Sequence, residues 1–152
     1  MNEKGSADPQ RGRKLVADLA QRAIEAFRTD ARKEFDQLVK TYEGCGAVVG
    51  IFGLGSVTIT VHDGSVHVDA ADRARETKLL ARGAAYPETV IAISEGRMSP
   101  LEAFHTGDLV VRAPSEELHK AYGLMVTLSD AAIRSSRLQG VLKDFRAATE
   151  AK

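Results

Sequence analysis

Histidine side chains are the groups in this sequence best suited to acid–base or metal chemistry. His62, His67 and Asp69 fall on one face of an alternating segment, where imidazole and carboxylate ligands could hold a metal ion. Solvated cross-strand polar residues explain the same spacing, so we expect no metal site. His105 and His119 flank an apolar segment and are the two candidate general bases. The spacing favours a non-catalytic protein and leaves an enzyme as an alternative.

A glycine-rich stretch from Gly44 to Gly55 contains the only cysteine, Cys45. A thiolate could act as a nucleophile, but a lone cysteine in a Gly-Cys-Gly turn is more often inert. Phosphate-binding loops follow a strand and open a helix, whereas this stretch follows a helical pattern and enters apolar, strand-like sequence. We therefore expect no nucleotide, no disulfide and no other cofactor.

The charge balance excludes several classes of partner. Lys and Arg together number 21, as do Asp and Glu, so the formal charge is zero. Such a chain lacks the basic surface typical of nucleic-acid binding and the polybasic cluster that holds proteins on anionic membranes. No apolar run approaches the roughly 20 residues that cross a bilayer, and the first residues do not resemble a signal peptide. We expect a cytoplasmic protein without an integral membrane segment or a nucleic-acid partner.

The length predicts a single domain over residues 13–152 after a flexible N-terminus at residues 1–12. Between residues 14 and 43 apolar side chains recur every three or four positions, which predicts a long amphipathic helix with a break at residues 29–30. A second long amphipathic helix is predicted at residues 130–149. These helices would cover a sheet formed by the middle of the chain.

A β-hairpin is the most specific local pattern. Residues 57–62 and 65–69 alternate apolar and polar side chains, and an Asp-Gly pair between them is typical of a two-residue hairpin turn. This turn places Val61 opposite Val66, so the apolar side chains of both strands share one face and the polar ones face solvent. The remaining elements that we expect are strands at 47–54, 89–94 and 109–112 and short helices within 71–84 and 115–122.

The segment that follows the expected strand at 89–94 begins with a glycine and a basic residue, Gly96-Arg97. Next come a helix start at Ser99-Pro100, an Ala-aromatic pair, and a glycine that leads into a strand. This run, residues 96–111, resembles the signature of the sterol carrier protein 2 family. Residues 83–94 are similar to the turn and strand that precede the signature, and the resemblance covers roughly residues 31–128.

The resemblance implies an α/β (α+β) fold, with a mainly antiparallel five-stranded sheet, helices packed on one face, and an apolar tunnel for lipids between the two layers. Leu101 and Phe104 are expected to point onto the sheet. Tyr86, His105 or Tyr122 would orient a polar head group. By this resemblance, together with the apolar segment that follows the motif and includes Leu128, the ligand-binding residues are Met98, Leu101, Phe104, Leu109, Val111, Leu118, Tyr122 and Met125.

Two departures from the family concern the cavity wall and its entrance. The family has a helix of several turns before the Gly-basic pair, where this chain has only Glu95 after the strand expected at 89–94. After the last strand the family has a Gly-Asp turn, where this chain reads Ala113-Pro114-Ser115. Residues 14–28 exceed the family's plan, and could supply the missing wall or pair with a second copy.

The sequence thus predicts a protein that binds and carries a lipid, sterol-like or isoprenoid ligand without catalysis. The favourable free energy would come from removing apolar surface from water, about 25 cal/mol per Å². Two alternatives stay open. One is a cyclase-type or isomerase-type enzyme that uses the same cavity, and the other is a scaffold that forms a homodimer through the long first helix.

Overall fold

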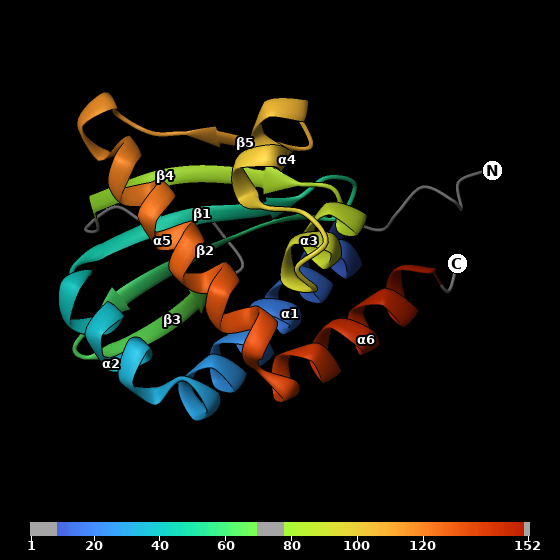
Figure 1. Cartoon of the computed structure of the whole chain (residues 1–152), viewed down its shortest axis with the longest axis horizontal. Helices are drawn as coiled ribbons and strands as arrows, with labels where there is room; N and C mark the ends of the chain where they lie inside the picture. The colour runs from blue at the N-terminus through green and yellow to red at the C-terminus, as the bar shows by residue number, and fades with distance from the viewer. Residues whose placement is uncertain (1–8, 70–77, 151–152) are drawn as a thin grey trace.

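The computed structural model describes residues 9–69 and 78–150. These residues form an α/β fold in which helices lie over one five-stranded sheet (Figure 1). In chain order the elements are α1 (Pro9–Asp30), α2 (Arg32–Thr41), β1 (Cys45–Ile51), β2 (Gly55–His62), β3 (Ser65–Asp69), β4 (Lys78–Ala85), α3 (Pro87–Ser94), α4 (Pro100–Thr106), β5 (Leu109–Arg112), α5 (Ser115–Arg134) and α6 (Ser136–Glu150).

The sheet has the strand order β3-β2-β1-β4-β5. β1 runs parallel to β4, whereas the β1–β2, β2–β3 and β4–β5 pairs are antiparallel. The sheet is therefore mixed, so the expectation of a mainly antiparallel five-stranded sheet is confirmed only in part. The β2–β3 hairpin separates β1 from β4 in the chain, which allows the crossover that a parallel pair requires.

The predicted hairpin is confirmed in its register, with Val61 paired to Val66. Its turn is made by Asp63 and Gly64, whose φ values of 54° and 73° are the left-handed conformations that a two-residue turn of this kind requires. The Asp-Gly pair therefore specified both the turn and the pairing.

The expectation that the polar face of this hairpin is solvated is wrong for β2. Thr58 and Thr60 are only 1% and 8% exposed. β2 lies between β3 and β1 in the sheet, so neighbouring strands flank these short side chains on both sides. His67 on the edge strand β3 is exposed, as the alternation predicted.

The break in the first helical pattern is confirmed within two residues of the predicted position. α1 ends at Asp30 and α2 begins at Arg32, because Ala31 between them has a non-helical φ of −133°. α1 buries Val16 and Phe27 within its own chain. The apolar stripe that suggested pairing with a second copy is therefore used in the intramolecular core, and the homodimer stays a prediction.

The fourth strand lies earlier in the chain than predicted. Residues 78–85 form β4, so the short helix expected within 71–84 is wrong for 78–84, and residues 71–77 lie outside the described part of the chain. The strand expected at 89–94 is wrong as well, because this segment forms α3. Pro87 at the helix start and Glu88 in the first turn favour a helix despite the β-branched side chains that follow.

This correction also removes one departure from the resembled family. The helix that we expected to be missing before Gly96 is α3 itself. The connection from α3 to α4 begins at Glu95, followed by Gly96 in a left-handed conformation with φ of 81°. The chain therefore has a helix at the place where the predicted cavity lacked a wall.

The short helix of the motif is confirmed in detail. Ser99 accepts a hydrogen bond from the Glu102 backbone N–H at 3.1 Å, and Glu102 accepts one from the Ser99 backbone N–H, which completes a capping box. Pro100 occupies the first turn, and Gly107 ends the helix with φ of 85°.

The last two helices divide at a different residue from the one predicted. α5 continues to Arg134 instead of ending near residue 122, and α6 begins at Ser136. Ser135 between them is extended, and its hydroxyl accepts a hydrogen bond from the Leu138 backbone N–H at 3.1 Å, so it starts α6 as a side-chain cap. Gly123 did not end α5, because a glycine in a helix interior costs only about 1 kcal/mol.

The helices pack on the face of the sheet that carries Ile51, Val57 and Val61. Val57 lies in a cluster with Val16 of α1 and Phe145 of α6. By the β1–β2 and β2–β3 pairings, the other strand residues of the clusters lie on the same face. The prediction of helices packed on one face agrees with this arrangement.

Candidate functional site

The helix layer leaves part of this sheet face uncovered. Val49 and Val57 are register partners on β1 and β2, so their side chains lie on the same face. Val57 is 1% exposed, whereas Val49 is 39% exposed, although β1 is the central strand. Next to Val49 on β4 is Gly83, which has no side chain, and Gly83 pairs in turn with Val111 of β5. The floor of the candidate site is this apolar part of β1, β4 and β5.

α5 lies over the sheet and packs on β4 (Figure 1). Glu117, Ala121 and Leu128 follow at intervals of four and seven residues, which places them on one stripe of the helix. Glu117 contacts β4 and Ala131 packs with Val61, so this stripe faces the sheet. Leu128 on the stripe is nevertheless 40% exposed.

A neighbouring stripe of α5 faces the connection between α3 and α4. A methyl-sized group added at Gly96 would lie 3.4 Å from Ile133, which places Ile133 beside this connection. Leu118 and Tyr122 precede Ile133 on the same stripe by helical spacing and are 46% and 41% exposed. These two predicted ligand-binding residues are therefore exposed on the side of α5 that carries Ile133.

Leu101 and Phe104 share one stripe of α4, and both are 45% exposed. The buried face of α4 is formed by Pro100 and by Ala103, which is fully buried. That Leu101 and Phe104 point onto the sheet stays a prediction.

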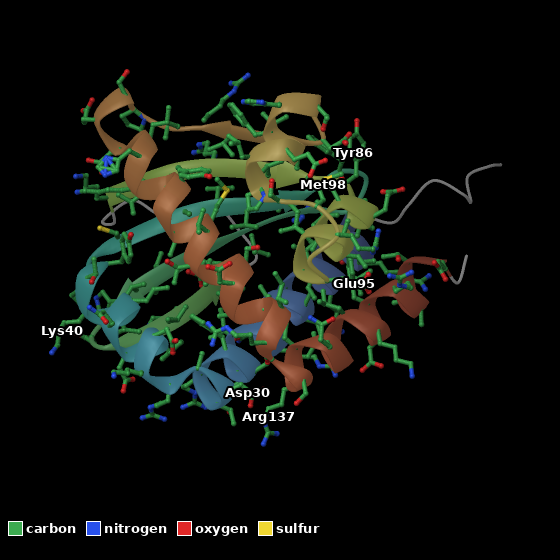
Figure 2. All side chains as sticks on the ribbon, viewed as in Figure 1. Asp30, Lys40, Tyr86, Glu95, Met98 and Arg137 are labelled. Atoms are coloured by element: carbon green, nitrogen blue, oxygen red, sulfur yellow. The ribbon has the colours of Figure 1, made fainter. Side chains whose placement is uncertain are left out.

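The remaining predicted ligand-binding residues are half-buried. Leu109 and Val111 lie on β5, Met125 lies on α5, and Met98 lies in the connection between α3 and α4, where Figure 2 labels it. Leu109 pairs with Ala85, and Val111 with Gly83, so both share the sheet face of Val49. The structure thus places the predicted residues on β5, α4, α5 and the connection that surround the uncovered sheet face.

Apolar exposure is distributed unevenly over the molecule. None of the described large apolar side chains that are exposed belongs to α1, α2 or α6. Conversely, no described residue of β4, β5 or α4 belongs to the three packed apolar clusters. We give the name open apolar surface to the residues in this half of the molecule that lie outside the three clusters. Its members include Val49, Gly83, Val111, Leu118, Tyr122 and Leu128.

Two aromatic side chains mark the end of the open apolar surface where β1 and β4 finish. Phe52 follows β1 and Tyr86 follows β4, and their ring centroids lie 4.8 Å apart. Tyr86, one of the predicted head-group contacts, is 46% exposed. Its hydroxyl-bearing ring therefore lies at the surface and not inside the fold.

The opposite end of β4 carries an ion pair beneath α5. Glu117 Oε2 lies 2.8 Å from Lys78 Nζ, and the Glu117 side chain is only 8% exposed. The hydrogen bond from Lys78 holds the pKa of Glu117 below its usual range, with further attraction from Lys120, while the carboxylate raises the pKa of Lys78. Sequence reasoning missed Glu117, which the pattern indicated only as an acidic residue in a first helical turn.

The two candidate general bases are both exposed. His119 lies on α5 two residues after Glu117, away from the sheet-facing stripe, and three residues before Tyr122. His105 lies on α4, with its ring centroid 6.2 Å from that of Phe104. A catalytic role for either histidine stays a prediction.

The other candidate residues, for metal binding and for nucleophilic catalysis, lie on β1, β2 and β3. Within residues 9–69 and 78–150, no group of three His, Cys, Asp or Glu side chains is placed to hold a metal ion, so His62, His67 and Asp69 do not form a metal centre. Cys45 begins β1 opposite Lys78, and the glycine-rich stretch around it forms β1 and the turn to β2. It therefore opens a hairpin and not a helix. No helix of the described segments is long and apolar enough to span a bilayer.

A separate groove lies between α1 and α6, away from every predicted ligand-binding residue. Its volume is about 700 Å³, and charged side chains such as Arg22, Glu25 and Asp144 line it. Arg22 and Asp144 form an ion pair at 2.9 Å across it. This groove is open and crossed by an ion pair, so a lipid chain bound there would lie beside charged side chains.

The described residues therefore define an α/β protein whose helices pack one half of a sheet face and leave the other half open. Three solved structures have similar folds. They are a UbiJ-SCP2 ubiquinone synthesis protein (12% identity, TM-score 0.53, 86% of this chain and 95% of that one), domain 2 of a sterol carrier protein from Helicoverpa armigera (17%, 0.53, 82% and 94%), and sterol carrier protein 2 from Yarrowia lipolytica in its apo form (11%, 0.52, 83% and 98%).

These similarities show that the chain has the sterol carrier protein 2-like fold, as the sequence resemblance implied. At these identities they show the fold alone. No protein-family model and no curated protein matches the sequence.

Val49 and Gly83 are the floor residues that sequence reasoning missed. Val49 belongs to an apolar run without polar alternation, so the sequence does not show which side chains of the run share a face of the sheet. Gly83 lies in a segment that we expected to form a helix and a turn. The pairing of β1 with β4, which brings them together, spans a crossover that no local pattern indicates. Only the buried partner Val57, on the predicted hairpin, could have indicated the face of β1 to which Val49 belongs.

Proposed function

We propose that this protein binds and carries an apolar ligand (a lipid, sterol-like or isoprenoid molecule) on the open apolar surface. The observation that carries the proposal is the exposure of Val49 on the sheet and of Leu128 on α5, on the two surfaces that face each other. Apolar side chains on opposed layers of a domain normally cover one another. Here an apolar ligand would complete the packing.

The similar solved structures support the ligand class. Two are named as sterol carriers and one as a ubiquinone synthesis protein, and sterols and ubiquinone are apolar molecules. This chain covers 94 to 98% of these three solved chains, so the similarity in fold extends to both the sheet and the helices that border the open apolar surface.

Desolvation supplies the driving force. Each methylene group of a ligand that leaves water contributes about 0.8 kcal/mol, reduced by the cost of immobilising the ligand. Met98 and Met125 border the surface, and methionine side chains adapt to ligands of varied shape. The mechanism requires no bond-making step.

The proposal is tested by extracting gently purified full-length protein with organic solvent and identifying bound molecules by mass spectrometry. The stripped protein is then titrated with a fluorescent probe, a dodecanol labelled with pyrene at its far end. We expect a co-purified apolar molecule at a substantial fraction of the protein concentration and saturable probe binding. A protein that carries no such molecule and does not bind the probe would refute the proposal.

A matched pair of variants locates the site. Leu128→Glu places a charge on the sheet-facing stripe of α5 and should weaken probe binding at least tenfold, because the charge would lose water on ligand binding. Thr127→Glu adds the same charge at the next residue, on a different side of the helix, and should leave binding unchanged. Equal losses in both variants would place the site elsewhere.

A further inference from the structure

Glu117 has a buried carboxylate oxygen without a hydrogen-bond donor. Oε2 is paired with Lys78 at 2.8 Å, but Oε1 is buried and has no hydrogen-bond partner among the described residues. Lys120 Nζ forms an ion pair with Oε1 at 3.5 Å, at the upper limit of a hydrogen-bond distance. Buried carboxylate oxygens are normally satisfied, so this atom indicates a missing donor.

Glu117 lies beneath α5 at the Lys78 end of β4. Glu117 shares the sheet-facing stripe of α5 with Ala121 and Leu128. On the sheet below, Leu79 and Leu80 follow Lys78, and then Ala81 pairs with Ala47 and Gly83 with Val49, so apolar residues lie between Lys78 and the floor.

The length of β4 sets the length of a ligand that could contact both Glu117 and the floor residue Gly83. From Lys78 to Gly83 the strand advances about 17 Å at about 3.3 Å per residue. A molecule with a polar group at Glu117 and an apolar body of this length would reach Gly83 and its register partner Val49.

The protonation state of Glu117 determines which polar group fits. The hydrogen bond from Lys78 keeps its pKa low, so the group is an ionised carboxylate that only accepts hydrogen bonds. A hydroxyl group donates one and carries no charge. A ligand carboxylate would meet a like charge at this position, which disfavours fatty acids.

We propose that Glu117 anchors the polar end of the ligand, with Oε1 accepting a hydrogen bond from an alcohol or phenol hydroxyl group. This inference rests on the proposed function and narrows it to hydroxylated apolar molecules. Lys78 is a positioning residue, because it holds the other carboxylate oxygen and touches no ligand atom in this arrangement.

The test compares two probes that differ only in the donor, the pyrene-labelled dodecanol and its methyl ether. Each is titrated into stripped wild-type protein, into Glu117→Met, which removes the acceptor, and into Glu117→Gln, which keeps a neutral acceptor. Glu116→Met is the matched control, because Glu116 is the preceding residue of the same helical turn and is exposed.

We expect wild type and Glu116→Met to bind the alcohol roughly ten times more tightly than the ether, the range for a hydrogen bond to a charged group. In Glu117→Met the two affinities should agree within about threefold while ether binding is unchanged, and Glu117→Gln should give an intermediate ratio. If Glu117→Met does not fold, the Glu117→Gln ratio decides alone.

Equal binding of both probes by wild type, or an undiminished preference in the Glu117 variants, would overturn the anchor and leave apolar carriage standing. Failure of wild type to bind either probe would overturn the proposed function itself.

Discussion

Val49 and Val57 lie side by side on one face of the sheet, yet Val57 is 1% exposed and Val49 is 39% exposed. Val57 is covered by Val16 of α1 and Phe145 of α6. Val49 lies toward β4, where α5 is the helix that packs on the sheet and where Leu128 stays exposed. The boundary between the packed and the open half of the fold therefore passes between two adjacent strands.

Filling the floor should abolish ligand binding without harming the fold. A methyl-sized group at Gly83 would meet only the Val110 carbonyl oxygen at 3.6 Å, an ordinary contact, so Gly83→Leu can be accommodated between Val49 and Val111. We expect at least a tenfold loss of probe affinity with an unchanged or raised thermal midpoint.

The control for this substitution is Gly140→Leu, on α6 and in open space. It should leave probe affinity unchanged. Retention of wild-type affinity by Gly83→Leu would show that the ligand does not lie on β4.

The start of α1 should be intolerant of any side chain at Gly12. A Cβ atom there would lie 2.2 Å from the Leu54 carbonyl oxygen, so the helix or the β1–β2 turn must move. We expect Gly12→Ala to lower the free energy of unfolding by about 1–3 kcal/mol, the usual cost of overpacking. Urea unfolding followed by circular dichroism measures it.

The same exchange at Gly140 should act in the opposite direction. Nothing lies within 4 Å of the added group, so the better helix propensity of alanine should raise stability by about 0.5–1 kcal/mol. If Gly12→Ala proved as stabilising as Gly140→Ala, the close packing of α1 on the turn would be wrong.

Acid should weaken the junction between α1 and α6. Asp30 accepts hydrogen bonds from the Ser135 hydroxyl at 2.8 Å, from the Arg137 backbone N–H at 3.3 Å and from Arg137 Nε at 3.1 Å (Figure 2). The bond from Ser135 is the largest cause that lowers the pKa of Asp30 below its usual 3.8.

A lowered native pKa means that this contribution to stability is complete above the unfolded value and is lost as the pH falls through the native value. Asp30→Asn should therefore be less stable than wild type at pH 7, and the difference should shrink below pH 3.8. Chemical denaturation at several pH values gives the two curves. A difference that does not change with pH would exclude the carboxylate charge as its origin.

Local patterns predicted the elements whose structure is decided within a few residues. The Asp-Gly turn fixed the β2–β3 register, the Ser99 capping box and Gly107 bounded α4, and α1 broke at Ala31 where a break was expected. Each depends on backbone conformations or hydrogen bonds that neighbouring residues supply.

The wrong predictions have one cause in common, which is packing between segments that lie far apart in the sequence. Residues 89–94 contain β-branched side chains that suit a strand, but their burial on one side and Pro87 at the start made them a helix. β4 was missed because its small residues do not alternate.

The predicted ligand-binding residues lie on β5, α4, α5 and the connection before α4, and their role in binding stays a prediction. The floor at Val49 could not be predicted, because it depends on a parallel pairing across a crossover.

Methyl NMR of protein labelled at valine and methionine tests the central claim most directly. On addition of the pyrene-labelled dodecanol to stripped wild-type protein, the account predicts shifts at Val49, Val111, Met98 and Met125 and none at Val16 of α1, which is buried. Shifts confined to Val141, which lines the groove between α1 and α6, or no shifts at all, would contradict it.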